Sequence, residues 1–412
     1  MVHFYINLIE LLCHGNYSVR KMEGKFKLKA CEEIDARSSE LNSIGQEIWK
    51  NPELGYEEFA AHELLTTFLE KEGFNVSKKT PLETSFIARY GNSEGLKIGI
   101  LCEYDALPGV GHACGHNLIA EAGIGAALGI KSVLDVIPEK NVQLIVFGTP
   151  AEECGDGKTR MIAKGVFDEP DICMMSHPAP YEIPIPMWLA ACDLKISFKG
   201  KASHAAAAPW EGINALDAAV ACYNNVSMLR QQMKTTSRVH CTIVKGGDKP
   251  NIIPEYAEMH YFIRGLTDAD KTDLYQKVTN CAKGAAEATG CTVEFAINCE
   301  MSSINTNKIL IELYISNAKS LGVSFNDEDQ VTKLLAGSDM GDVTQIKPSI
   351  HPLYRIQTAG ANHTHKFTQA TGDVINQLPT LNSAKSMAMT AIDVICKPEL
   401  MEDIKKSFQG VC

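Results

Sequence analysis

LKIGILC, at residues 96–102, is a short apolar run that leads directly into the polar loop EYDALPGVGHACGHN at residues 103–117. A small-residue helical pattern then extends from Asn117 to Val136, and two further apolar runs follow at Val142–Phe147 and Ile172–Met175. Short apolar runs that alternate with helical patterns are typical of parallel strands covered by helices on both faces. The sequence therefore predicts an α/β fold with a mostly parallel sheet between helices.

Helical periodicity also flanks these runs. After a polar N-terminal segment, apolar residues recur at helical spacing over Glu32–Lys50 and again over Glu57–Glu72, which ends at Gly73. The pattern returns at Ile309–Lys319 and at Ser383–Cys396 near the C-terminus. We expect these helices to cover the sheet.

From Asp193 the pattern changes to a compact series of short elements. In order, we expect strand, helix, strand, strand, helix and strand at Leu194–Lys199, Asn214–Met233, Val239–Val244, Ala257–Arg264, Asp270–Thr289 and Thr292–Asn298. This β-α-β-β-α-β order is that of a ferredoxin-like unit. A chain of 412 residues exceeds a single core. We therefore expect a discontinuous first domain, residues 1–190 and 303–412, with the ferredoxin-like unit inserted at residues 191–302.

Composition limits the classes of partner. The net charge is −11, from 39 basic and 50 acidic residues, and no basic run offers a nucleic-acid footprint. The 14 cysteines are scattered without a CxxC pair, which favours reduced thiols. The apolar stretch Val2–Cys13 lacks the features of a signal peptide, and no segment reaches the length of a membrane span. We expect a cytoplasmic protein that binds neither nucleic acid nor membrane.

Polar clusters follow each of the three apolar runs, where an open α/β sheet places its ligands. They are residues 103–109 with 112–117, then 149–153, then 176–178. A thiol, imidazoles and adjacent carboxylates form a donor set that suits zinc or manganese. Of Glu152 and Glu153, one could bind metal while the other serves as general base. In the alternative interpretation, the two glutamates are solvated loop residues and Cys114 is a small buried apolar residue. This interpretation would require polar clusters without a function after all three strands.

Other polar residues are ambiguous by themselves. His363 and His365 could be metal ligands or surface histidines, and Asp339 and Asp342 could bind a substrate amine or cap a helix. In the insert, candidates for binding a carboxylate and an oxyanion are His204, Asn251 and Arg264. That role requires the insert to close over the metal site, and Arg264 alone could simply pair with a surface acid.

Together these motifs resemble the aminoacylase/carboxypeptidase family of co-catalytic metallopeptidases. Within it, the chain is most similar to the branch of aminobenzoyl-glutamate hydrolases, auxin-conjugate amidohydrolases and Xaa-Arg (β-alanyl-lysine) dipeptidases, nearest to the last. The resemblance extends from about Ile34 to the C-terminus. It is carried by residues 103–108, 112–117, 149–153, 200–204 and 337–342.

This resemblance implies two divalent ions, zinc or manganese, and assigns residue roles. Cys114 would bridge the ions, and Glu152 would be the general base. The further ligands would be His116, Glu153, His177 and a C-terminal histidine. Alignment with the usual motif of the branch favours His363 as this histidine, whereas alignment with the bacterial hydrolases favours His365. The insert would form a homodimer through which His204 reaches the scissile carbonyl, while Asn251 and Arg264 hold the substrate carboxylate.

The predicted reaction is hydrolysis of an amide bond in a dipeptide or N-acyl amino acid, preferably a dipeptide with a basic C-terminal residue. Aminobenzoyl-glutamate or another N-acyl amino acid is the alternative substrate. Two rival functions are a non-catalytic binding protein on the same fold and an enzyme with Cys114 as nucleophile and His116 as its base. The second would leave the acidic pair without a role.

Overall fold

The computed structural model describes residues 22–137, 141–325 and 336–410. These residues form two compact units, each described separately below. The first unit contains the described residues up to Pro186, those from Asn305 to residue 325, and those from Val343 onward. The second contains residues 187–304 together with 336–342.

A six-stranded sheet lies at the centre of the first unit, in the order β1-β2-β4-β3-β5-β11. The strands are β1 (Asn75–Lys78), β2 (Phe86–Gly91), β3 (Leu96–Cys102), β4 (Val142–Gly148), β5 (Ile172–Met174) and β11 (Ser349–Ile350). β3 pairs in parallel with both β4 and β5, and β5 pairs in parallel with β11. The mostly parallel sheet is thus confirmed. β1 and β2, which are antiparallel to their neighbours, were not predicted.

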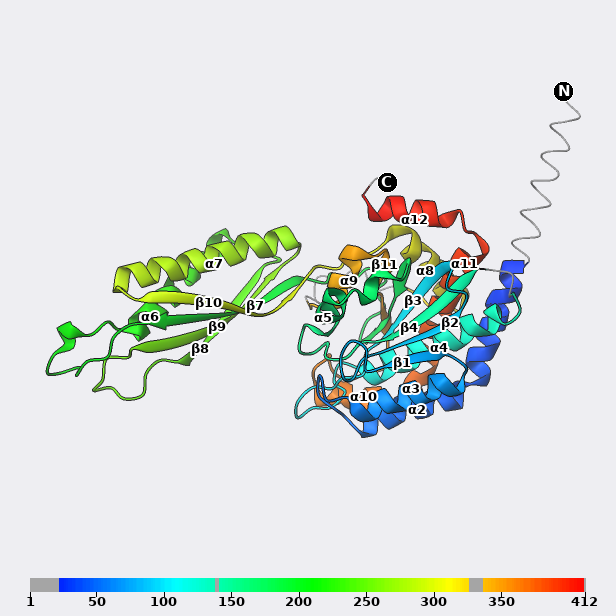
Figure 1. Cartoon of the computed structure of the whole chain (residues 1–412), viewed down its shortest axis with the longest axis horizontal. Coiled ribbons are helices and arrows are strands. Elements are labelled where there is room, and N and C mark those ends of the chain that lie inside the picture. Colours follow the sequence, from blue (N-terminus) through cyan, green and yellow to red (C-terminus); the bar gives the residue numbers. More distant parts are fainter. Residues whose placement is uncertain (1–21, 138–140, 326–335, 411–412) are drawn as a thin grey trace, which may run out of the picture. The chain divides into compact units, whose positions relative to one another are not determined.

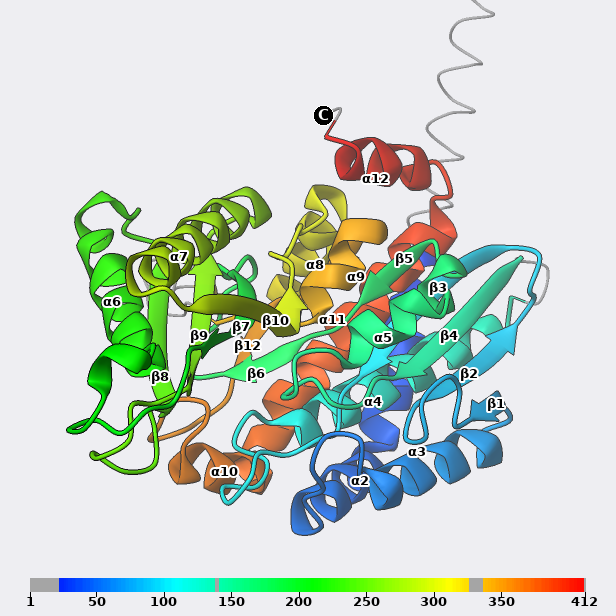
Figure 2. The ribbon, with the colours of Figure 1, turned by 60° about the vertical axis from the view of Figure 1, so that its left-hand side comes forward.

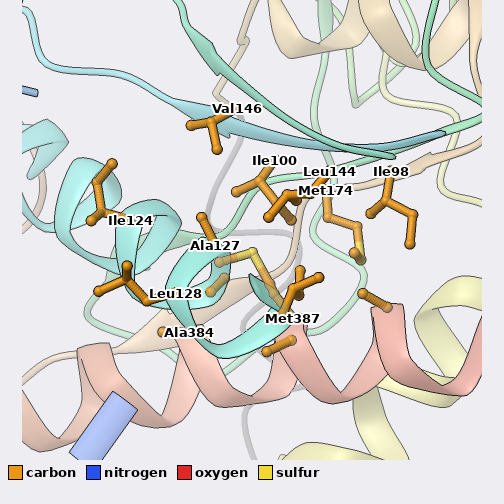
Figure 3. Packing of buried hydrophobic residues seen from close by; sticks show 14 of the residues in the cluster. Ile98, Ile100, Ile124, Ala127, Leu128, Leu144, Val146, Met174, Ala384 and Met387 are labelled. Atoms are coloured by element: carbon orange, nitrogen blue, oxygen red, sulfur yellow. The ribbon is translucent and has the colours of Figure 1, made fainter. Parts of the chain in front are cut away.

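The core of this unit lies between the sheet and helices α4 (His116–Leu134) and α11 (Gln377–Cys396). Ile98, Ile100 and Leu144 on the strands face α4, and α11 packs beyond it through Ala384 and Met387 (Figure 3). Among the described helices, only α4 is long and apolar enough to cross a membrane, but 89% of that window is buried inside the protein. Its apolar composition therefore reflects its position in the core.

The remaining helices of this unit surround the sheet (Figure 2). They are α2 (Ser38–Lys50), α3 (Phe59–Lys71), α5 (Gly157–Ala163), α8 (Lys308–Ser320), α10 (His365–Thr371) and α12 (Leu400–Phe408). The N-terminal helix was expected from Glu32, but the chain is already helical over residues 22–36. Its first turns are charged and are held by an ion pair from Lys27 to Asp393. Phe26, Ala30 and Ile34 also pack on the core at helical spacing, so the apolar pattern extends further toward the N-terminus than predicted.

The second unit has the predicted β-α-β-β-α-β order and an antiparallel sheet in the order β10-β7-β9-β8. Its elements are β7 (Ala190–Lys199), α6 (Ala215–Met228), β8 (Arg238–Lys245), β9 (Tyr256–Gly265), α7 (Asp268–Thr289) and β10 (Thr292–Met301). Helices α6 and α7 lie along one face of this sheet (Figure 1). Burial alternates strictly along β9, because only one of its faces packs against the helices.

Residues 336–342 belong to the second unit, although the expected boundary left them in the first. The backbone N–H of Leu189 donates to the carbonyl of Ala336 at 2.7 Å, and the N–H of Ser302 donates to the Asp342 carboxylate at 2.9 Å. Asp342 therefore binds the backbone at the end of β10. Helix α9 (Met340–Ile346) begins within this segment.

Candidate metal centre

The predicted polar clusters of the first unit meet at one end of its sheet. Cys114 and His116 follow β3, and His177 begins β6 (His177–Ala179), which pairs in parallel with β12 (Leu353–Arg355). One potential ligand atom from each of these three residues lies within 4.8 Å of the others. The Cys114 sulfur is 3.3 Å from the His177 Nε2.

Gly115 makes this convergence possible. Its φ is +88°, in the left-handed region, and it is the N-cap of α4. A Cβ on Gly115 would lie 2.5 Å from Cγ of Pro178, the residue after His177. A larger residue would push apart the two loops that supply the ligands.

Hydrogen bonds orient both imidazoles. His116 Nδ1 is 2.9 Å from an Asp105 carboxylate oxygen, and His177 Nδ1 is 2.8 Å from the Pro178 carbonyl oxygen. An acceptor opposite Nδ1 assigns the proton to that atom and leaves Nε2 for a metal. Burial lowers the pKa of His177 to about 4, so that its imidazole is neutral. A neutral imidazole is the form that binds metal.

A second group of potential ligands shares Cys114. Cys114, Glu153 and His363 place ligand atoms within 4.8 Å of one another, as do His116, Glu152 and Glu153. His363 Nε2 is 3.7 Å from Glu153 Oε1, and His116 Nε2 is 3.8 Å from Glu152 Oε2. Because Cys114 belongs to two of these groups, the geometry is compatible with a thiolate between two ions.

The two C-terminal histidines are placed differently. His363, at φ +66°, donates its backbone N–H to the Ala113 carbonyl at 2.8 Å, which brings its ring to the Cys114 group. The neighbouring Asn362 amide lies 3.4 Å from the Cys114 carbonyl oxygen and 3.3 Å from that of Pro178. His365 starts α10, and it is in none of the potential ligand groups found among the described residues.

The residues present fit a cation. Within the described part of the chain, His116 Nε2 and Glu153 Oε1 are buried atoms with no hydrogen-bond partner. Burial raises the pKa of Glu153 to about 7 and that of the Cys114 thiol well above its usual range. A cation would compensate for the lost solvation and release both protons.

Three charged residues of this centre were missed as site residues by sequence reasoning. Asp105 orients His116 with one oxygen and accepts the Glu153 N–H with the other, at 2.9 Å in each case. Glu103 and Lys158 form a fully buried ion pair, and the second Glu103 oxygen is 3.5 Å from His116 Nε2. For Asp105 and Glu103, the signal available in the sequence was their position directly after β3.

In the second unit, the loop before α6 carries His204. Its Nδ1 accepts the N–H groups of Ala206 and Ala207 at 3.2 and 3.1 Å, which leaves the exposed Nε2–H as a donor. The Ala205 N–H donates to the Asn251 carbonyl at 3.0 Å, so the loops of His204 and Asn251 lie side by side. The structure confirms that His204 is on a loop.

Arg264 lies at the opposite end of β9 from this loop pair. Asn251 precedes the first residue of the strand, Tyr256, whereas Arg264 is the last but one, with its guanidinium 4.5 Å from the Phe262 ring centroid. Eight residue steps of about 3.3 Å separate Tyr256 and Arg264 by roughly 26 Å. The same chain therefore cannot bring Asn251 and Arg264 to one small carboxylate.

The chain is similar to known proteins over most of its length. Residues 190–289 match the peptidase dimerisation domain family. Over 408 residues the chain is 45% identical to the Xaa-Arg dipeptidase of Mus musculus, covering 96% of this chain and 94% of that protein. It is 34% identical over 297 residues to a polypeptide of the p-aminobenzoyl-glutamate hydrolase of Escherichia coli, covering 67% of this chain and 61% of that one.

Among solved structures, a dinuclear metal binding peptidase from the M20 family of Bacillus subtilis has the same fold. It matches with a TM-score of 0.68 at 20% identity, covering 88% of this chain and 99% of that one. The sequence relationship to the mouse protein covers 96% of this chain and so extends over both units. Because that relationship is far above chance and nearly full length, the chain belongs to the M20 peptidase family, the co-catalytic metallopeptidases that its motifs resemble.

Proposed function

We propose that this enzyme hydrolyses the amide bond of dipeptides with a basic C-terminal residue, at a centre of two divalent ions. The observation that carries the proposal is the pair of ligand groups that share Cys114, with the Glu152 carboxylate at their edge. The ligands would be Cys114, His116, Glu153, His177 and His363. The nearly full-length relationship to an Xaa-Arg dipeptidase supports this substrate class.

Glu152 is the proposed general base. Its side chain is mostly buried beside His116, so it would take a proton from the attacking water and return it to the leaving amine. Bound ions would lower the pKa of that water and polarise the substrate carbonyl. His204, whose Nδ1 accepts backbone N–H groups, would donate Nε2–H to the developing oxyanion.

The roughly 26 Å between the two ends of β9 supports a homodimer in which each site takes residues from both chains. Arg264 would hold the substrate carboxylate in one chain, while His204 and Asn251 would come from the other. The match to the peptidase dimerisation domain supports this assembly, as do the exposed Val220, Tyr223 and Met228 of α6. Sedimentation at several protein concentrations would test it, and a monomer at assay concentrations would contradict it.

Zinc or manganese is the proposed metal, because both accept a mixed set of sulfur, nitrogen and oxygen ligands. A cytoplasmic location is also proposed. The twelve described cysteines are all free thiols, as the reducing cytosol would keep them. Metal analysis of protein purified without added metal, together with localisation of the tagged chain, would test the two proposals.

The substrate is tested with a small panel after removal of metal and its replacement by zinc or manganese. The panel contains β-alanyl-lysine, an Xaa-Arg dipeptide, p-aminobenzoyl-glutamate and an N-acetyl amino acid. We expect metal-restored cleavage of the two basic dipeptides alone. Preference for the glutamate conjugate would support the alternative suggested by the more distant bacterial relative. Activity that resists metal removal would contradict the metal mechanism.

The two adjacent glutamates provide a matched pair of variants. Glu152→Gln should reduce kcat by at least about 10³-fold while the metal content stays at the wild-type value. Glu153→Gln should lose metal, because Glu153 is the proposed ligand. Equal metal loss in both variants would make Glu152 a ligand instead of the base. An active Glu152→Gln variant would eliminate it from proton transfer.

A further inference from the structure

The turn between α2 and α3 contacts two of the loops that form the metal centre. The Glu53 carbonyl accepts the Ala106 N–H at 2.8 Å, directly beside Asp105. Gly55 lies against the loop after β4, where an added Cβ would be 2.6 Å from the Cys154 sulfur. In the structure, residues 53–58, here called the bracing turn, connect the loops after β3 and β4.

Glu58 makes the most specific contact of the bracing turn. One carboxylate oxygen accepts the backbone N–H of Ala151 at 2.8 Å, and the other accepts the Thr84 hydroxyl at 2.6 Å. Glu58 and Thr84 are both fully buried, and the Tyr104 hydroxyl donates to the Thr84 carbonyl at 2.5 Å. These contacts fix the Glu58 carboxyl group in one orientation.

Ala151 is the residue immediately before Glu152, and its φ is +59°. A left-handed conformation costs a residue with a Cβ about 1–2 kcal/mol, so it persists only where surrounding contacts enforce it. The hydrogen bond from the Ala151 N–H to Glu58 is such a contact. The direction in which the Glu152 side chain leaves the backbone depends on this conformation.

Tyr56 fixes the far side of the same loop. It too is left-handed, at φ +67°, and its hydroxyl donates to the Asp156 carboxylate. Arg160 covers the Tyr56 ring at 4.8 Å from the centroid and forms a 2.7 Å ion pair with Asp156. The bracing turn therefore holds the loop on both sides of Glu152 and Glu153.

We propose that Glu58 is a positioning residue for the reaction, and that it fixes the Glu152 carboxylate by holding the N–H of Ala151. This inference rests on the proposed role of Glu152 as general base. Proton transfer requires the base to be within hydrogen-bond reach of the water, and a displacement of about 1 Å can cost 10²-fold in rate. Substrate binding does not depend on that distance, so the effect should appear in kcat and not in KM.

The test separates the reach of the Glu58 side chain from its charge. We measure kcat and KM for Glu58→Gln, Glu58→Asp and Glu58→Ala in metal-loaded, full-length protein. The assay is at pH 8, because burial raises the pKa of Glu58 to about 7. Gln keeps an oxygen at the same distance but removes the charge, whereas Asp keeps the charge and retracts it. Thr66→Ala is the matched control, because it removes a buried hydroxyl from the neighbouring α3 whose bonds to described residues stay within that helix.

We expect kcat to fall about 10–100-fold in Glu58→Ala and nearly as much in Glu58→Asp, with KM within about 3-fold and metal content unchanged. Glu58→Gln should stay within about 5-fold of wild type, and Thr66→Ala should keep the wild-type kcat per folded molecule. Even if Glu58→Ala does not fold, the comparison of Glu58→Gln with Glu58→Asp shows whether the reach or the charge of the side chain is required.

An active Asp variant with an inactive Gln variant would overturn the inference, because charge and not reach would then be required. Loss of metal, or full activity in both the Asp and Ala variants, would overturn it as well. The wild type and Glu152→Gln are assayed alongside. An inactive wild type or an active Glu152→Gln variant would refute both the proposed function and this inference. Full activity of Glu58→Ala together with an inactive Glu152→Gln variant would refute this inference alone.

Discussion

Replacing Glu121 by glutamine should make the stability of the enzyme less sensitive to pH. Glu121 lies in the core helix α4, is 1% exposed, and accepts a 2.7 Å hydrogen bond from the Gln377 amide. It packs so closely against α2 that a Cβ on Gly45 would be 2.4 Å from its second oxygen. Burial raises the pKa of Glu121 to about 8.

The sign and size of the effect follow from this pKa. An unfolded glutamate titrates near pH ~4.3, so between there and pH 8 the folded chain keeps a proton that the unfolded chain releases. The free energy of unfolding therefore falls by about 1.4 kcal/mol for each pH unit in this window. Between about pH 5.5 and 7.5 the loss is about 2.7 kcal/mol, or roughly 5 °C in Tm for a unit of this size. Glu121→Gln removes this loss.

Calorimetry of metal-loaded wild type and Glu121→Gln at pH 5.5, 6.5 and 7.5 would measure the effect. We expect the difference between the Tm of the variant and the Tm of the wild type to increase, in favour of the variant, as the pH rises. Because both proteins carry the same metal centre, its own pH dependence cancels in the difference. Glu32→Gln, on the exposed surface, is the control and should show no such trend. A Tm difference that is constant across the three pH values would refute the reasoning.

Three further changes test the metal centre and its supports. Asp105→Asn should weaken metal binding about 10–100-fold, because it disturbs the orientation of the His116 imidazole. The affinity is measured by competition with a chelator, and an unchanged affinity would contradict that role. Lys158→Met removes one partner of the buried ion pair with Glu103 and should lower the free energy of unfolding by about 3–5 kcal/mol in denaturant titrations. A loss under about 1 kcal/mol would contradict a stabilising role for this pair. Gly157→Ala should lower kcat at least about 10-fold, because its Cβ would lie 1.8 Å from a backbone carbonyl of the loop that carries Glu152. Gly284→Ala, with no atom within 4 Å of its Cβ, should keep full activity, and equal kcat in the two glycine variants would show that the loop adapts.

Local sequence determined the elements that were predicted correctly. Leu96–Cys102 is β3 as expected, because a buried parallel strand is apolar on both faces. The alternation along β9 likewise identifies a strand with one buried face. β2 was missed because its C-terminal half is only partly buried, so that its sequence, FIARYG, lacks a clear pattern. The helix at residues 22–36 was predicted only from Glu32, because charged residues separate the apolar positions of its first turns.

The clusters that contain Cys114, His116, Glu153 and His177 could be predicted because each follows a strand, and parallel strands end at one edge of a sheet. The contacts that orient these ligands could not. Glu58 and Ala151 are 93 residues apart, and only the folded chain shows that one holds the other. The choice between His363 and His365 likewise required the backbone, since the left-handed turn at His363 decides which ring faces Cys114.

His204 and Arg264 lie at opposite ends of the second unit. In the proposed dimer, each active site would therefore contain residues from both chains. A chain that carries Glu152→Gln and a chain that carries His204→Ala would each be inactive alone, because every site in either homodimer is defective. After the chains exchange partners, a mixed dimer would contain one site with both defects and one site with neither. Random pairing would therefore restore about a quarter of the wild-type activity from two inactive proteins. In a cell with two alleles, such variants would complement each other.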